Sequence, residues 1–216
     1  MRETVIRTIE EKKVIAIVRG VFGEECLNLA KALHQGGISL MEVTFDPIDA
    51  EKRKKTVATI ELLSREMGEE MCFGAGTVTT VEMVEQAKAA GAQYIVSPNT
   101  HADVIYATRS HDMVSIPGAY TPTEIRFAKD CGGDLIKVFP AGSLGASYFK
   151  SVHAPLEDCK LLAFGNVNEN NIRDYLAAGA VGAGVASCLF QKEWVKEGEW
   201  WKITDAARRV MEKIGL

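Results

Sequence analysis

Short apolar runs alternate with amphipathic segments along almost the whole chain. Eight runs are apolar enough to be buried strands, and they lie at residues 14–19, 39–45, 71–77, 94–97, 113–117, 135–139, 160–164 and 180–185. The segments between them place apolar residues at helical spacing, and residues 1–12 form a leading amphipathic segment of the same kind. The pattern therefore predicts one helix followed by eight strand–helix units.

Capping residues support several of these helices. Thr121 and Glu124 surround a proline at the first helical position, which is typical of a capping box. Thr79 and Glu82 have the same spacing and predict a second box. Asn168 is expected to cap the helix that follows the seventh strand.

Eight similar units without a second compositional regime predict a single domain over residues 1–216, an α/β fold of the (β/α)₈ TIM-barrel type with an N-terminal helix. The alternative is an open, doubly wound sheet. Its phosphate-binding fingerprint, G-x-G-x-x-G after the first strand, is missing, because residues 19–23 read Arg-Gly-Val-Phe-Gly. The repeated units therefore favour a closed barrel.

The composition is that of a well-mixed globular protein. Of its 216 residues 47% are hydrophobic and 25% charged, and the net charge is −4, which argues against nucleic acid as a partner. The one basic run, residues 52–55, is expected to be a solvated helix face. The first apolar run, residues 14–18, is too short for a signal peptide or a membrane span.

Cysteine and histidine spacings indicate neither disulfides nor a metal. The five cysteines are scattered, odd in number and form no C-x-x-C pair, which is typical of a reduced, cytoplasmic protein. The four histidines show no H-x-H or H-E-x-x-H spacing, so we expect no metal site.

Lys137 lies in the middle of an apolar strand, residues 134–140. Strand alternation places it on one face with Leu135 and Phe139. An unperturbed lysine has a pKa of ~10.4, and burial in an apolar pocket favours the neutral amine, which is a nucleophile towards carbonyl carbon. The other interpretation is a lysine at a strand end whose amine reaches water.

Other polar residues stand at strand ends. A TIM barrel forms its active site at the carboxyl ends of its strands, where Arg19, Glu42, Thr44, Thr77 and Lys137 would converge. Buried charges need partners, so this gathering favours a functional site. Taken singly, Glu42 could be a salt-bridge partner for Lys137, Arg19 a solvent-facing residue, and either threonine an ordinary strand residue.

Glycines mark a second set of candidates. The segment at residues 73–77, Phe-Gly-Ala-Gly-Thr, would let the backbone approach a ligand closely. The loops after the seventh and eighth strands, the usual phosphate site of barrels, contain Gly165, Asn166, Gly184 and Ser187. The need for small residues in a tightly closed barrel explains Gly184 equally well.

These motifs together resemble one enzyme family, the 2-keto-3-deoxy-6-phosphogluconate (KDPG) aldolases, which also act as 4-hydroxy-2-oxoglutarate aldolases. The resemblance covers nearly the whole chain, in order. It rests on Glu42-Val43-Thr44-Phe45, Gly74-Ala75-Gly76-Thr77-Val78, Ile95-Val96-Ser97-Pro98, Pro117-Gly118 with Thr121-Pro122-Thr123-Glu124, and Ile136-Lys137-Val138-Phe139-Pro140.

The resemblance implies a class I lyase, free of metal and cofactor, that forms a Schiff base with pyruvate and assembles as a homotrimer. Lys137 resembles the Schiff-base lysine and Glu42 the general acid/base. Thr77 resembles the residue that binds the substrate carboxylate. Arg19 resembles the arginine that a subset of the family uses for the same carboxylate. The implied substrate is 2-dehydro-3-deoxy-6-phosphogluconate, with 4-hydroxy-2-oxoglutarate as a second.

The chain departs from the family pattern on the phosphate side. Residues 163–166 read Ala-Phe-Gly-Asn where the family has Pro-Thr-Gly-Gly, and residues 186–187 read Ala-Ser where it has Gly-Ser. Pro98, Gly165, Asn166, Gly184 and Ser187 are still expected to border the substrate. The alternatives are a phosphosugar isomerase or epimerase on the same barrel and a non-catalytic ligand-binding barrel.

Overall fold

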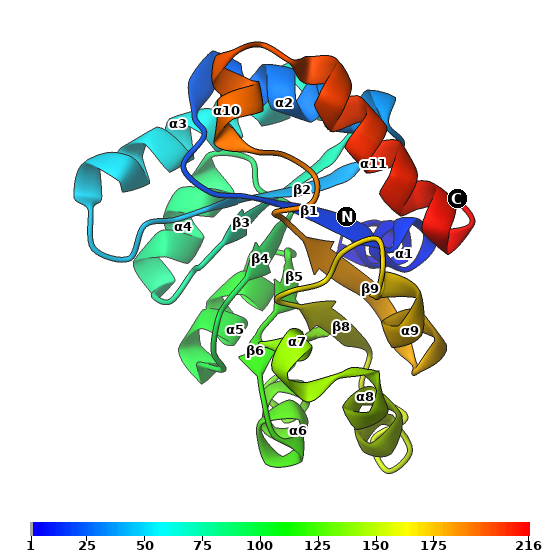
Figure 1. The fold of residues 1–216 in the computed structure, drawn as a ribbon. Coiled ribbons are helices and arrows are strands. Elements are labelled where there is room, and N and C mark those ends of the chain that lie inside the picture. Colours follow the sequence, from blue (N-terminus) through cyan, green and yellow to red (C-terminus); the bar gives the residue numbers. More distant parts are fainter. Residues whose placement is uncertain (1) are drawn as a thin grey trace.

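The structure is a computed structural model, and it describes residues 2–216. A ring of parallel strands lies inside a layer of helices (Figure 1). The strands are β1 (Val14–Val18), β2 (Leu40–Thr44), β3 (Cys72–Gly76), β4 (Tyr94–Val96), β5 (Val114–Ile116), β6 (Gly118–Ala119), β7 (Ile136–Val138), β8 (Leu161–Phe164) and β9 (Ala180–Val185). The helices are α1 (Arg2–Lys12), α2 (Gly23–Gln35), α3 (Ala50–Met67), α4 (Val81–Ala89), α5 (Ala102–Ser110), α6 (Pro122–Asp130), α7 (Ala141–Leu144), α8 (Ala146–His153), α9 (Ile172–Ala177), α10 (Lys192–Lys196) and α11 (Trp200–Ile214).

The fifth strand of the barrel is divided into β5 and β6. Pro117 separates them, and it has no N–H to donate to a neighbouring strand. The sheet order is β5-β4-β3-β2-β1-β9-β8-β7-β6, so the two halves of one strand form its two ends. The ring closes there, because Lys137 N–H donates to the Pro117 carbonyl at 2.9 Å and Phe139 N–H to the Ala119 carbonyl at 3.0 Å. When β5 and β6 are counted as one strand, the barrel has eight strands, as the eight apolar runs predict. The (β/α)₈ barrel is therefore confirmed.

Two apolar cores lie on the two faces of this sheet. The larger core lies between strands and helices. The smaller core fills the inside of the ring and includes Ile15, Leu40, Tyr94, Leu135 and Leu162. Burial of both strand faces explains why the sequence shows continuous apolar runs rather than alternation.

Helix α1 belongs to the inner core. Its residues Val5 and Ile9 are buried in the same cluster as the inward side chains of the strands. Arg2 on α1 pairs with Asp134 at 2.5 Å, and Asp134 also accepts from Ser115 N–H at 2.9 Å. The predicted leading helix is therefore confirmed over residues 2–12, and it packs at the amino end of β7.

The predicted helix caps meet different outcomes. The box of Thr121 and Glu124 at the start of α6 is confirmed. The start of α4 is one residue later than predicted, because the hydroxyl of Thr80, not Thr79, accepts from Met83 N–H at 3.3 Å. Likewise, α9 begins after Asn171 rather than after Asn168.

Among the helices of residues 2–216, none combines the length and the apolar character that a membrane-spanning segment needs.

Candidate active site

Lys137 is the middle residue of β7 and points into the ring. It shares its face with Leu135 and Phe139, as strand alternation predicts, and it is only 8% exposed. Its Nζ lies 4.8 Å from the ring centroid of Phe139 and 4.8 Å from that of Phe164. Burial lowers the pKa of the Lys137 amine; Glu42 opposes this shift and Arg19 adds to it. The environment therefore favours the neutral, nucleophilic form.

Glu42 is the central residue of β2 and is buried, with 1% exposure. Burial raises the pKa of its carboxyl to about 7, against the opposing effects of Lys137 and Arg19. Its Oε2 has no hydrogen-bond partner among residues 2–216. A Cβ on Gly76 would lie 2.6 Å from Glu42 Oε1, so this glycine provides the space for the carboxyl group. A carboxyl with this pKa can both accept and donate a proton near neutral pH.

Arg19 and Thr77 follow directly after β1 and β3. Arg19 Nη2 donates to Thr77 Oγ1 at 2.9 Å. Thr77 holds a left-handed backbone conformation with a φ of 59°, which a β-branched residue seldom adopts. Such strain often occurs at ligand sites. Arg19 is exposed and Thr77 half-buried, so both remain accessible to a small anion.

Gly74 does not serve the role that its motif predicts. The register pairs Glu42 with Gly74 and Gly74 with Tyr94 across β2, β3 and β4. A Cβ on Gly74 would lie 2.2 Å from the Tyr94 ring, so this glycine makes room for an aromatic side chain and not for a ligand. Of the two glycines in the motif, Gly76 is the one that makes room for the side chain of a candidate catalytic residue.

The loop after β8 holds two of the predicted substrate residues. Gly165 and Asn166 both have left-handed backbones, with φ of 93° and 56°. The Gly165 carbonyl accepts from Gly142 N–H at 2.9 Å. Asn166 is exposed, and its Cβ lies 2.6 Å from where a Cβ on Gly142 would stand. This loop is therefore tied to α7, which lies beside it in Figure 1.

The remaining three predicted residues have different surroundings. Gly184 faces the inside of the ring, where the Phe164 ring covers it: a Cβ there would lie 2.3 Å from Phe164 Cε1. This contact favours the interpretation that Gly184 is small for packing, and its place in the substrate site stays a prediction. Ser187 is exposed after β9. Pro98 is half-buried after β4, and its backbone packs against Gly118.

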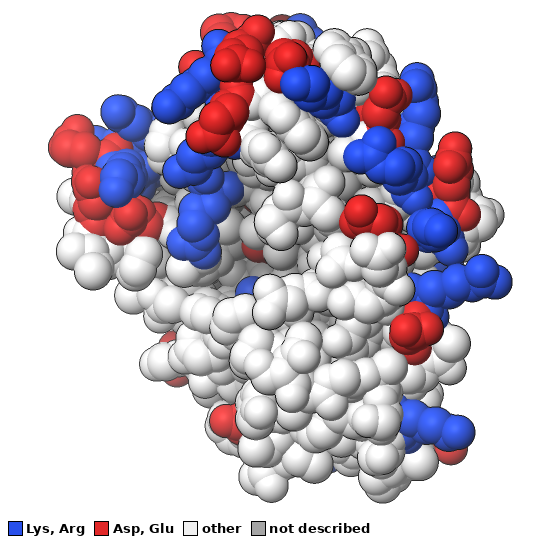
Figure 2. Space-filling model, viewed as in Figure 1, with Lys and Arg blue, Asp and Glu red and all other residues white. Residues whose placement is uncertain are grey.

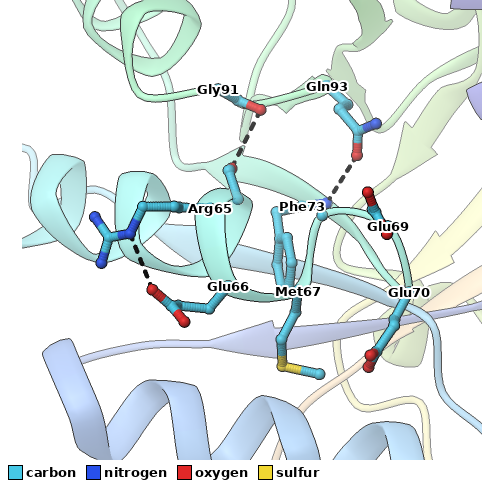
Figure 3. A pocket seen from close by; sticks show the side chains of 10 residues that line it. Arg65, Glu66, Met67, Glu69, Glu70, Phe73, Gly91 and Gln93 are labelled. Atoms are coloured by element: carbon cyan, nitrogen blue, oxygen red, sulfur yellow. Dashed lines mark hydrogen bonds and ion pairs between the residues drawn. The ribbon is translucent and has the colours of Figure 1, made fainter.

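The barrel surface is hollowed near the middle of the view in Figure 2, with small basic and acidic patches inside the hollow. A separate hollow of about 510 Å³ lies between the end of α3 and the starts of β3 and β4 (Figure 3). There Gln93 Oε1 accepts from Phe73 N–H at 3.2 Å, and Arg65 pairs with Glu66 at 2.9 Å. Because it lies at the amino ends of these strands, it is not near Lys137.

No group of three or more histidine, cysteine, aspartate or glutamate side chains within residues 2–216 is placed to hold a metal ion. The expectations of no metal and no cofactor stay predictions. The five cysteines are free thiols in the structure.

Three aromatic residues at the site were not among the predicted site residues. Phe139 and Phe164 flank the Lys137 amine, and Tyr94 lies in the same register row as Glu42, with Gly74 between them. Strand alternation in residues 135–139 places Phe139 on the face of Lys137, so the sequence contained that signal. The sequence also singled out Phe164, because it stands where the family motif has threonine.

Comparison with known proteins gives a consistent result. The profile of the "KDPG and KHG aldolase" family matches residues 5–206. A 2-dehydro-3-deoxy-phosphogluconate aldolase of Treponema pallidum is 33% identical over 214 residues, 99% of this chain and 99% of its own. A 2-dehydro-3-deoxy-6-phosphogalactonate aldolase of Escherichia coli is 32% identical over 82% of this chain and 84% of its own. A crystal structure of KDPG aldolase from Legionella pneumophila, with pyruvate captured as a covalent carbinolamine, has a TM-score of 0.83 and 27% identity, covering 95% of this chain and 97% of its own.

Proposed function

The chain belongs to the KDPG and KHG aldolase family, and on that premise we propose that it cleaves a 2-keto-3-deoxy sugar acid to pyruvate and an aldehyde through a Schiff base on Lys137. The observation that carries the proposal is the burial of this one lysine among apolar rings at the carboxyl end of the barrel. The match to an aldolase family does not support the two alternative functions, a phosphosugar isomerase or epimerase and a non-catalytic ligand-binding barrel.

The first step is imine formation. The Lys137 nitrogen attacks the C2 carbonyl of the substrate and a C–N bond forms. The carbonyl oxygen then leaves as water, with one proton from the amine and one from solvent. The product is an iminium cation that can accept the electron pair of a neighbouring carbon–carbon bond. The lowered pKa of Lys137 supports this role, because the attacking amine must be unprotonated.

The second step is cleavage of the bond between C3 and C4. Glu42 accepts the proton of the C4 hydroxyl, the C3–C4 electron pair moves to the iminium, and an aldehyde and an enamine result. Glu42 then returns the proton to C3. Water adds to the new iminium, which releases pyruvate, restores the Lys137 amine and returns one proton to solvent. The pKa of about 7 at Glu42 suits a group that both takes and gives this proton.

Substrate orientation falls to Arg19 and Thr77. A guanidinium can hold a carboxylate through two parallel hydrogen bonds, and this fixes the keto carbon at one distance from the amine. The hydrogen bond between Arg19 and Thr77 supports a shared role in holding the carboxylate. The rest of the substrate would lie among the loops that contain Pro98, Gly165, Asn166 and Ser187. The named relatives suggest the first substrates to test, the 6-phosphogluconate and 6-phosphogalactonate derivatives.

Reductive trapping tests the central step. Borohydride added with pyruvate reduces the iminium and should leave one reduced pyruvate on the peptide that contains Lys137. Lys160→Met is a matched control, because Lys160 pairs with Glu10 at the start of β8, outside the site. It should trap like the wild-type protein, whereas Lys137→Met should not trap. Label on another peptide, or none, contradicts the proposal.

We also propose that the barrel is a single domain and that the enzyme is a cytoplasmic homotrimer. Large hydrophobic side chains stand exposed on α5, just before α6 and on α6, where Tyr106 is 56%, Tyr120 42% and Phe127 52% exposed. The same side of the molecule is mostly uncharged in Figure 2. Light scattering during size-exclusion chromatography should give three times the chain mass, and Phe127→Glu should lower it. A monomeric wild-type protein contradicts the trimer.

A further inference from the structure

Two phenyl rings form one wall of the space around the Lys137 amine. The rings belong to Phe139, at the end of β7, and Phe164, at the end of β8, and each centroid lies 4.8 Å from Nζ. Phe164 is 1% exposed, so its position is set by packing inside the barrel. The opposite wall is polar and comes from β1, β2 and β3 with Arg19, Glu42 and Thr77.

Phe164 is fixed by a glycine on the neighbouring strand. The register places Phe164 beside Gly184, and a Cβ on Gly184 would lie 2.3–2.6 Å from three atoms of the ring. The ring therefore lies against the glycine backbone and occupies the space that a side chain would fill. Phe139 covers Gly165 in a similar way, with ring atoms 3.3 Å from where a Cβ would stand.

The two phenyl rings that form this wall carry neither a charge nor a hydrogen-bond donor. Phe164 covers Gly184 on β9, and Phe139 covers Gly165 after β8. The N–H of Gly142 in α7 is already bonded to the Gly165 carbonyl at 2.9 Å. A phosphate dianion that moves onto such a surface loses its hydration without a compensating charge or hydrogen bond.

The substrate is expected to use the two walls differently. This step rests on the proposed function. The polar wall is occupied by the carboxylate, at Arg19 and Thr77, and by the C4 hydroxyl, at Glu42. The carbon chain beyond C4 then has the phenyl rings beside it, and hydroxyl or phosphate groups there gain no partner from Phe164.

We propose that Phe164 determines the aldehyde specificity of this enzyme, and that it favours short, unphosphorylated aldehydes over their phosphorylated counterparts. In the condensation direction the enamine carbon attacks the aldehyde carbon, a C–C bond forms, and the aldehyde oxygen takes its proton from Glu42. Phe164 takes no part in this chemistry. It acts through the shape and polarity of the space where the aldehyde binds.

A matched pair of aldehydes tests the proposal. D-glyceraldehyde and D-glyceraldehyde 3-phosphate differ only in the phosphate, and condensation of each with pyruvate is followed by loss of the pyruvate methyl signal in NMR. The kcat/KM of the wild-type enzyme should favour D-glyceraldehyde by at least tenfold. Phe164→Thr should shift this ratio at least tenfold towards the phosphate, whereas Phe164→Leu, which keeps an apolar side chain, should keep the ratio within threefold of the wild-type value.

Three outcomes overturn the proposal: a wild-type preference for the phosphorylated aldehyde, an unchanged ratio in Phe164→Thr, and an equal shift in Phe164→Leu. If Phe164→Thr does not fold, the ratio of the two kcat/KM values of the wild-type enzyme decides by itself. Exchange of the pyruvate methyl protons in D₂O without any aldehyde separates this proposal from the proposed function, because it needs only the enamine. Absence of exchange in the wild-type enzyme overturns the proposed function, whereas exchange with an unchanged ratio overturns only the role of Phe164.

Discussion

Arg19 donates a hydrogen bond to Thr77 across 2.9 Å, and so joins the ends of two strands that are not neighbours in the barrel. β2, which carries Glu42, lies between them. The guanidinium therefore reaches across the strand of the candidate acid/base group. This arrangement places a cation, a hydroxyl and a carboxyl group on one side of Lys137.

Loss of the Arg19 guanidinium should weaken pyruvate binding. Charge-assisted hydrogen bonds contribute about 1.5–3 kcal/mol, so Arg19→Ala should raise the KM for pyruvate in the condensation reaction roughly 10- to 100-fold. Steady-state kinetics measures this. Arg53→Ala is the control, since Arg53 lies in the first turn of α3 and donates to the Pro47 carbonyl at 3.3 Å rather than to Thr77. Equal KM values for Arg19→Ala and the wild-type enzyme would remove Arg19 from the carboxylate site.

Activity should fall in acid because Glu42 must be ionised to accept a proton. With the pKa of Glu42 raised to about 7 by burial, kcat/KM for cleavage should decrease about tenfold per pH unit below that pH. Glu42→Gln should lower kcat about 10²- to 10⁴-fold, the usual contribution of a general base. A pH–rate profile from pH 5 to 9 measures both effects. A wild-type profile that is flat between pH 5 and 7 contradicts the role of Glu42.

The free energy of unfolding should also depend on pH through Glu42. It should be higher in acid, where activity is lower. The folded-state pKa of Glu42 is about 7 and its ordinary value 4.5, so between these values the unfolded chain releases the proton and the folded protein retains it. The free energy of unfolding should therefore fall as pH rises through this window, by about 2–3 kcal/mol, and Glu42 should have no further effect above it. Urea unfolding at pH 5 and pH 8 tests this, with Glu42→Gln lacking this contribution. A parallel pH dependence in both proteins would contradict it.

Gly74→Ala should destabilise the barrel. The added Cβ would lie 2.2 Å from the fully buried Tyr94 ring, and overpacking of this kind costs about 1–3 kcal/mol. Thermal unfolding followed by circular dichroism measures the loss. The double variant Gly74→Ala/Tyr94→Leu should show a favourable coupling, because the smaller side chain leaves room for the methyl group. Strict additivity of the two single variants would indicate that the ring does not cause the loss.

The sequence predicts the barrel well because each strand position has a local signal. Every apolar run is short and bounded by turn residues, and both faces of each strand are buried, so the runs at residues 39–45 and 71–77 coincide with β2 and β3. The family motifs around Glu42 and Lys137 also predict the family that the comparisons confirm. These features depend on residues close together in the chain.

Contacts between strands could not be predicted in the same way. The Tyr94 ring fills the space over Gly74, and the Phe164 ring fills the space over Gly184, because the strand register places each pair side by side. Register in a closed barrel depends on the shear of the whole ring, which no single segment encodes. In the sequence alone, a glycine that makes room for an aromatic ring therefore cannot be told from a glycine that makes room for a ligand.

The barrel closes at the divided fifth strand, on either side of Pro117, and this suggests where the chain could be cut into two fragments. A break between β6 and α6 would give one fragment with Arg19, Glu42 and Thr77 and another with Lys137. Neither fragment alone would carry both the nucleophile and the acid/base group. Expressed together, they would regain activity only by reassociation, through the backbone bonds from β7 to Pro117 and Ala119 and the ladder between β1 and β9. The chain is thus suited to a split-enzyme reporter, in which release of pyruvate measures how often two separate polypeptides meet.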